Sequence, residues 1–269
     1  MKTKEFKIFL RHLVASGRHY FLKSEVMDKL AIASPQFNTI ASRFTKEKLI
    51  RHLSHGFFLI ISDVRSHLGF PYFSQFLDKY MEHIGIKYYV SLLWAAGFYG
   101  SSHQQPQLLQ VITENFTKDI IFDKATLSFH SLAHRFTNSS YEKKDMEGGG
   151  MNIASVEQVC IDLITFYEEC GYWNNVCTIM QSLINKCNAT RLSYLISFVK
   201  TSVLQRLGYI FELSNTRNIE TGQELIQKIK LELAHRKVYY VLLSPSELAE
   251  GTCNKQWKLT INDTIEPDL

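Results

Sequence analysis

The sequence has few cysteines, and no two of them have metal-binding spacing. Its five cysteines are odd in number and form no Cys-x-x-Cys pair. A disulfide framework or a zinc finger needs paired or clustered cysteines, so neither is expected. The composition predicts reduced, buried thiols in a cytoplasmic protein, with no cofactor and no bound metal.

Long apolar runs are also missing. The longest nearly apolar run, residues 88–100, is thirteen residues long, whereas a membrane-spanning helix needs about 20. A short apolar stretch at residues 8–10 is cut by Arg11 and His12, which indicates an amphipathic helix and not a signal peptide. The 45% hydrophobic and 13% aromatic content can still form a sizeable core. We therefore expect two domains and no membrane partner.

Positive charge is concentrated at the start of the chain. The first 56 residues contain eleven Lys or Arg against four Asp or Glu, a net charge of +7, whereas the other 213 residues have a net charge of −3. A basic block beside a nearly neutral body suggests a module that binds a polyanion, with double-stranded DNA as the expected partner. A basic but merely solvated surface is the alternative.

The spacing of apolar residues inside this block predicts a winged helix-turn-helix. A first helix around residues 6–13 ends at Gly17, and a second, capped by Ser24, covers residues 25–31. A third begins at Ser34-Pro35, a capping serine followed by proline at the first helical position. Two strands, residues 49–54 and 57–62, then flank a glycine-containing turn, which is typical of a β-hairpin.

The third predicted helix has polar side chains opposite its apolar stripe. In helix-turn-helix proteins this helix enters the major groove, where Arg, Gln and Asn read base edges and Lys, Ser and Thr contact phosphates. The basic hairpin would follow the adjacent backbone. Winged helices also serve as protein-interaction modules, so that interpretation stays open. The predicted DNA-binding residues are Gln36, Asn38, Thr39, Ser42, Arg43, Lys46, Lys48, Arg51 and His55.

The remainder is predicted to form a larger α/β domain. We predict a winged helix-turn-helix domain over residues 1–66 and a C-terminal domain over 67–269, with a mixed sheet and several helices in an overall α/β (α+β) fold. Residues 138–150 are polar, end in three glycines and predict a mobile loop. The expected helices cover residues 73–80, 88–99, 155–168, 173–185, 190–200, 203–213 and 220–234, and the expected strands 108–113, 118–122, 127–131, 238–243 and 256–262.

Few residues of the C-terminal domain suggest a catalytic or metal-binding role. Glu157 and Asp162 lie five apart on one expected helix, which favours capping and ion pairing over a shared catalytic role. Arg206 is expected to pack between helices and pair with an acid. His130 and His134 have metal-binding spacing only on a helix, and their neighbourhood is typical of a strand running into a loop. The polar turn after the second helix of the body, residues 100–105, suits a site or a packed turn equally.

One enzymatic arrangement remains as an alternative. Asp123 precedes Glu142 and Lys144 at the spacing of metal-dependent nucleases, in which two carboxylates hold Mg²⁺ and a lysine assists the attacking water. Residues 148–150 lack the following Lys-Ser or Lys-Thr of a P-loop. We therefore predict no catalytic residues, with a DNA nuclease as one competing hypothesis and a non-catalytic interaction module as the other.

Four stretches of the body resemble the AbiEi antitoxin family of type IV toxin–antitoxin systems. They occur in the family's order and span the body of the chain. The second stretch departs from the family pattern twice, with Val156 at a usual proline and Cys160 near a usual threonine. The stretches are Tyr89-Val90-Ser91 with Ala95-Ala96, Gly100 and His103-Gln104-Gln105; Ala154-Ser155-Val156-Glu157 with Asp162-Leu163; Gln205-Arg206-Leu207-Gly208-Tyr209; and Trp257-Lys258-Leu259 with Asn262 and Ile265-Glu266-Pro267-Asp268.

This resemblance implies two functions, one in transcription and one against a toxin. Proteins of the family have an N-terminal winged helix that binds inverted repeats upstream of their own operon and represses it. Their C-terminal domain counters a nucleotidyltransferase-like toxin, AbiEii, without forming a stable complex with it. The expectation is therefore a phage-defence antitoxin that is also a transcriptional repressor.

Overall fold

A computed structural model describes residues 2–61, 69–101, 108–132, 137, 139–215 and 220–266. The chain divides into two compact units. The first consists of Met1–Tyr89, Gln107–His134 and Lys143–Asn152, and the second of Val90–Pro106, Arg135–Glu142 and Ile153–Leu269. The predicted domain boundary between residues 66 and 67 falls outside the described residues.

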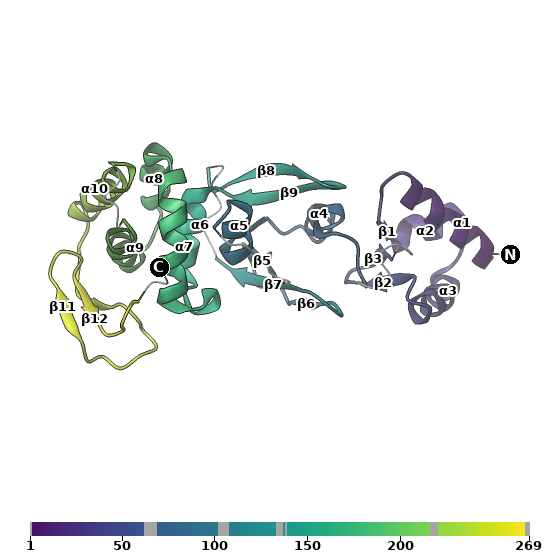
Figure 1. Ribbon diagram of the computed structural model, residues 1–269. Coiled ribbons are helices and arrows are strands. Elements are labelled where there is room, and N and C mark those ends of the chain that lie inside the picture. Colours follow the sequence, from purple (N-terminus) through teal and green to yellow (C-terminus); the bar gives the residue numbers. More distant parts are fainter. Residues whose placement is uncertain are drawn as a thin grey trace. The chain divides into compact units, whose positions relative to one another are not determined.

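The N-terminal elements have the order and pairing of a winged helix. Two antiparallel pairings give the sheet order β1-β3-β2, and the three helices lie around this sheet (Figure 1). Sequence analysis missed strand β1, which is only three residues long. The elements are α1 (Lys2–Ala15), β1 (Tyr20–Leu22), α2 (Lys23–Leu30), α3 (Ser34–Lys46), β2 (Ile50–His52) and β3 (Phe57–Ile60).

Two predicted helix caps are wrong by one or two residues. The N-cap of α3 is Ala33, so Ser34 is already helical, and the Gln36 side chain accepts a hydrogen bond from the Ala33 N–H at 3.3 Å. The N-cap of α2 is Leu22, and not Ser24. The glutamine at the third helical position thus satisfies the N–H of the N-cap residue, which is the glutamine half of a capping box.

The N-terminal helices and their sheet share an aromatic core. Phe6 of α1 is fully buried and makes edge-to-face contacts with Phe21, Phe37 and Phe44, at centroid distances of 5.6, 6.4 and 4.9 Å. Phe37 and Phe44 lie on one face of α3 because seven residues make about two helical turns. This packing places the opposite face of α3 toward solvent.

A six-stranded mixed sheet follows, with the order β6-β7-β5-β4-β9-β8. Strand β5 pairs parallel with β7, β6 pairs antiparallel with β7, and β4 pairs parallel with β9. A mixed sheet is confirmed, but the C-terminal strands predicted over residues 238–243 and 256–262 are not part of it and lie in a separate sheet. Its strands and the helical segments around them are η2 (Phe73–Gln75), α4 (Leu77–Ile84), β4 (Tyr88–Val90), α5 (Leu92–Phe98), β5 (Leu108–Thr113), β6 (Ile120–Ile121), β7 (Thr126–Ser131), β8 (Tyr141–Met146) and β9 (Gly149–Ala154).

Two predictions for this region are wrong. Residues 88–99 form strand β4 and then helix α5, and not one helix. The predicted mobile loop over residues 138–150 contains strand β8 and the start of β9, with a turn at Gly148, whose φ is +78°. The triple glycine is thus part of a β-hairpin.

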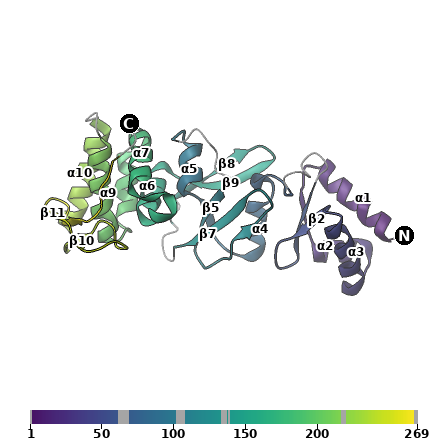
Figure 2. The same ribbon diagram turned by 60° about the horizontal axis from the view of Figure 1, so that its bottom comes forward.

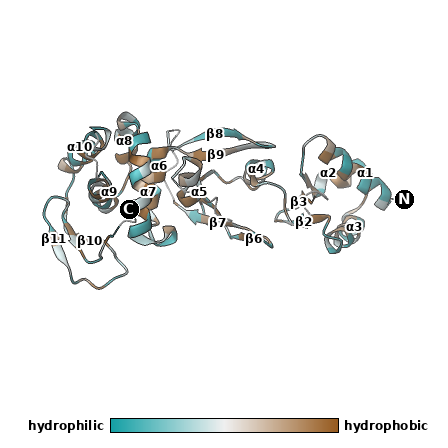
Figure 3. Ribbon diagram, in the orientation of Figure 1, coloured by the Kyte–Doolittle hydropathy of each residue, from teal (hydrophilic) through white to brown (hydrophobic). Residues whose placement is uncertain are grey.

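The second unit is mainly helical. Helices α6, α7, α9 and α10 lie side by side (Figure 2), and α6 and α7 are rich in hydrophobic residues (Figure 3). A small sheet, β10-β12-β11, follows them in sequence. The elements are α6 (Val156–Thr165), η3 (Glu168–Cys170), α7 (Tyr172–Leu183), η4 (Ile184–Lys186), α8 (Ala189–Ile196), α9 (Thr201–Ser214), α10 (Glu220–Ala234), β10 (Val241–Leu242), β11 (Thr252–Asn254) and β12 (Leu259–Ile261).

No helix within the described ranges is both long and apolar enough to span a bilayer.

Candidate nucleic-acid interface

The exposed face of α3 gathers most of the predicted DNA-binding side chains. Five of them line one open surface hollow of about 600 Å³. Gln36 and Lys48, which flank this set in sequence, are exposed as well. The face is polar and net positive, and the buried stripe behind it fixes its orientation. The five residues are Asn38, Thr39, Ser42, Arg43 and Lys46.

Near the N-terminal end of α3, local hydrogen bonds orient the polar groups. The Lys23 ammonium of α2 donates to the Asn38 Oδ1 at 3.0 Å and lies 5.5 Å from the centroid of the Phe37 ring. Thr39 Oγ1 donates to the Pro35 carbonyl at 3.0 Å. Lys23 thereby joins the candidate interface. Sequence analysis missed it because the contact joins two helices, which periodicity within one helix does not reveal.

Arg43 and Lys46 provide the positive charge near the other end of α3. The Arg43 Nε donates to the Glu47 carboxylate at 3.0 Å in an i,i+4 pair, and the Arg43 side chain is 68% exposed. Exposed pairs of this kind contribute only about 0.3–0.5 kcal/mol. An approaching phosphate can therefore replace Glu47 at little cost.

The position of Arg51 in the hairpin differs from the one predicted from the sequence. Arg51 lies within β2, opposite Leu59, and not at the hairpin tip. Its guanidinium lies 4.6 Å from the centroid of the Phe122 ring, donates to the Ile121 carbonyl and lies 3.9 Å from the Asp123 carboxylate. These contacts within the first unit engage Arg51, so we leave it out of the interface proposed below.

Residues in the turn of the hairpin also form hydrogen bonds with helix α4. His55 adopts φ +50°, and its carbonyl accepts a hydrogen bond from the His83 ring of α4 at 2.9 Å. The Ser54 hydroxyl lies 2.7 Å from that of Tyr80. Burial, and secondarily the charges of Lys23 and His55, lower the pKa of His52 from its usual value. His52 is thus biased toward its neutral form and adds little to the positive charge of the hairpin.

The comparison with known protein families concerns the part of the chain that follows the N-terminal helices and the hairpin. Residues 89–213 match the family model of the AbiEi antitoxin C-terminal domain. This match supports a role as an antitoxin or regulator.

Among solved structures, the chain resembles the crystal structure of the RV2827C protein from Mycobacterium tuberculosis. The TM-score is 0.66 at 15% sequence identity, over 93% of this chain and 89% of that one. At this identity the likeness concerns the fold alone. No curated protein matches the chain at a significant level.

Residues of the first two AbiEi-like motif stretches meet in the interior of the second unit. Ser91 Oγ donates to the Asp162 carboxylate at 2.7 Å, and the Gln158 side-chain amide donates to its other oxygen at 2.7 Å. All three side chains are buried. Residues from the first two motif stretches are therefore joined by a buried polar network, whose partners are costly to lose.

The last two AbiEi motif stretches also contact each other. The Gln205 side-chain amide donates to the carbonyls of Trp257 and Lys258, both at 2.9 Å. The Trp257 ring packs on Gly208 so closely that a methyl group there would lie 2.1 Å from the ring atom Cζ3. These motif residues fix the small C-terminal sheet to α9.

Two further residues were predicted to have structural roles. Glu157 accepts a hydrogen bond from the Asn188 N–H at 2.6 Å and lies 3.9 Å from Arg191, so its ion pairing is confirmed. Arg206 does not meet the expected acid, because its guanidinium donates to the Leu242 carbonyl at 3.1 and 2.9 Å. A partly buried backbone carbonyl thus satisfies this guanidinium without a second charged group.

The residues of the nuclease alternative have other partners. Asp123 faces Arg51 within the first unit, and Glu142 pairs with Arg191 at 2.8 Å within the second. Glu142 and Lys144 lie in strand β8, and not in the predicted loop. His130 lies in β7 as predicted, whereas His134 and residues 102–105 fall outside the described part of the chain. Within that part, no three His, Cys, Asp or Glu side chains cluster as metal ligands do.

Proposed function

We propose that this protein binds double-stranded DNA through the exposed face of α3 and represses its own operon. The observation that carries the proposal is the hollow lined by Asn38, Thr39, Ser42, Arg43 and Lys46. Amide and guanidinium groups suit base edges in the major groove, whereas ammonium and hydroxyl groups suit phosphates. The +7 charge of the first 56 residues supplies the long-range attraction.

The proposed interface differs from the one expected from the sequence. It retains Gln36 and Lys48 at the two ends of α3 and adds Lys23, which already touches Asn38. His55 remains exposed and can meet a phosphate. Arg51 is omitted because its interactions with Phe122 and Asp123 would have to break first.

Replacement of Arg43 and Lys46 by alanine should weaken binding to the DNA upstream of the gene by about ten-fold or more, since removal of one base-reading arginine costs about 1–3 kcal/mol. Gel-shift titrations at several salt concentrations measure this. The log–log salt slope should also become shallower by about 0.9 for each phosphate that the variant no longer neutralises. The matched control is Lys4→Ala/Lys29→Ala, which removes the same charge from exposed positions outside α3. Equal affinity of the two double variants, with both folded, would refute the proposal.

Glu47→Gln is expected to act in the opposite direction. It frees Arg43 from its exposed ion pair and removes a negative charge beside the proposed DNA surface. Affinity for the same DNA should therefore rise modestly, by about two-fold, the equivalent of a few tenths of a kcal/mol. Weaker binding of a folded Glu47→Gln variant would show that Arg43 does not face the phosphates.

The AbiEi domain would provide the antitoxin activity. We propose that it counters an AbiEii-like nucleotidyltransferase toxin of a type IV system, and we assume no stable complex between the two. Co-expression with a toxin from the same operon should restore bacterial growth, with the Arg43→Ala/Lys46→Ala variant retaining protection. Failure of the wild-type protein to protect would reject this part and leave DNA binding unaffected.

A further inference from the structure

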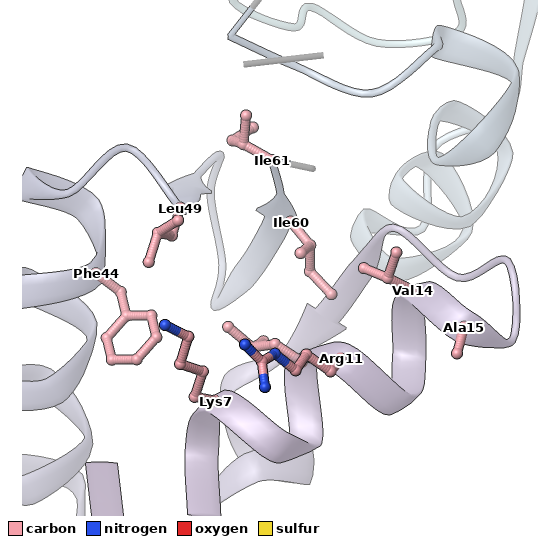
Figure 4. Close-up of a pocket in the computed structure, with 9 residues that line it drawn as sticks. Lys7, Arg11, Val14, Ala15, Phe44, Leu49, Ile60 and Ile61 are labelled. Carbon is pink, nitrogen blue, oxygen red and sulfur yellow. The ribbon is translucent and has the colours of Figure 1, made fainter. Parts of the chain in front are cut away.

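The winged helix contains a pocket that the proposed DNA interface does not use. It lies between α1, α3 and the end of β3 and has a volume of about 370 Å³ (Figure 4). Pockets for small ligands typically measure about 300–1,000 Å³. Its lining residues are Lys7, Leu10, Arg11, Val14, Ala15, Phe44, Leu49, Ile60 and Ile61.

This lining is apolar except for two cations. Lys7 and Arg11 stand one turn apart on α1 and extend between Phe44 on one side and Ile60 on the other (Figure 4). Within the described part of the chain, neither forms an ion pair with an acid, whereas Arg18 pairs with Glu25 at 2.6 Å in the same domain. Two like charges one turn apart repel each other. An anion between them would remove this repulsion.

From this geometry we propose that the pocket binds a small amphipathic carboxylate. Its ring or short chain would replace water over Leu10, Val14 and Phe44, and its carboxylate would lie between Lys7 and Arg11. Burial of the apolar part of the ligand and charge-assisted hydrogen bonds to the two cations would both favour binding. The apolar floor favours such a ligand over inorganic phosphate, and the two cations favour it over a neutral hydrocarbon.

The ligand would also regulate DNA binding, an extension that rests on the proposed function. Phe44 forms part of the pocket and belongs to α3, whose opposite face carries Arg43 and Lys46. A bound carboxylate adds negative charge behind this helix and reduces the attraction for DNA. Linkage then requires that DNA weakens ligand binding by the same factor.

Isothermal titration of the full chain with 1-naphthoate tests the site in the absence of DNA. We expect saturable one-site binding, with 1-naphthalenemethanol binding about ten-fold more weakly because it lacks the charge. Lys7→Gln/Arg11→Gln should weaken binding by a similar factor, and Ala15→Trp, which fills the pocket, should abolish it. The control is Lys4→Gln/Lys29→Gln, which removes the same charge outside the pocket and should bind as the wild type does.

Three results would contradict the proposed binding site. Absence of naphthoate binding to the folded wild-type protein, or unchanged binding by the folded Ala15→Trp variant, overturns the site. A wild-type dimer that Ala15→Trp converts to a monomer would show that a second copy of the chain covers the pocket, and also overturns it.

The regulatory extension has its own measurement. Saturating naphthoate should weaken wild-type DNA binding by about five-fold or more and leave that of Ala15→Trp unchanged. Naphthoate binding without any effect on DNA affinity overturns the regulation and retains the site. Absence of DNA binding by the ligand-free protein would instead reject the proposed function.

Discussion

Alanine at Gly208 is expected to destabilise the second unit by about 1–3 kcal/mol, the usual cost of overpacking a filled core. The added methyl group would lie 2.1 Å from the Trp257 ring, which is 1% exposed. The ring cannot move easily, because its Nε1 donates to Glu212 at 2.7 Å and its backbone N–H to Asn254 at 3.0 Å. Alanine in a helix is otherwise favoured over glycine by about 1 kcal/mol. Urea unfolding followed by tryptophan fluorescence measures the difference.

A double-variant cycle separates the steric effect from the helical one. Trp257→Leu removes the clashing ring atoms, so Gly208→Ala should be much less damaging, or even stabilising, in that background. If Gly208→Ala costs the same with and without Trp257, the close packing of these two motif residues does not explain why this position is glycine.

The elements predicted correctly from the sequence are those in which apolar residues recur with a clear helical period. Helix α10 (Glu220–Ala234) has the bounds that its pattern predicted, and α3 begins at Ser34, one residue before the predicted first position Pro35. In α3 the apolar repeat of Phe37, Ala41 and Phe44 alone determines which face is exposed. The exposed face of α3 could therefore be predicted without tertiary information, whereas the contact of Lys23 with Asn38 and the contacts of Arg51 could not.

The errors arose where tertiary packing decides the local structure. Residues 88–99 are apolar nearly throughout, and in such a run a buried strand and a buried helix have the same pattern. Strand β8 (Tyr141–Met146) is polar because it lies at the edge of its sheet, where one side stays exposed and charged residues are tolerated. The partners of Arg51 are about 70 residues away in sequence, and the pocket beside Lys7 and Arg11 joins three elements. No local signal encodes interactions of this kind.

Truncation of Phe6 to alanine is expected to be the most damaging single change in the winged helix. Its ring is fully buried and contacts Phe21, Phe37 and Phe44 edge to face. Removal of such a ring costs about 3–5 kcal/mol, because the transfer energy and the remaining cavity add up. Phe37 and Phe44 hold α3 in place, so DNA affinity should fall with stability although Phe6 lies on the buried side. Chemical denaturation and gel shifts on the same preparations test both effects.

The matched control is Ile8→Ala on the same helix. Ile8 is 45% exposed, and exposed positions of this kind usually change stability by less than about 0.5 kcal/mol. Phe6→Leu should lie between the two, because leucine fills part of the volume but forms no edge-to-face contacts. If Phe6→Ala unfolds no more readily than Ile8→Ala, the four phenylalanines do not form the core that orients α3. The exposed face assigned to DNA would then lose its structural basis, because only this core determines which side of the helix reaches the solvent.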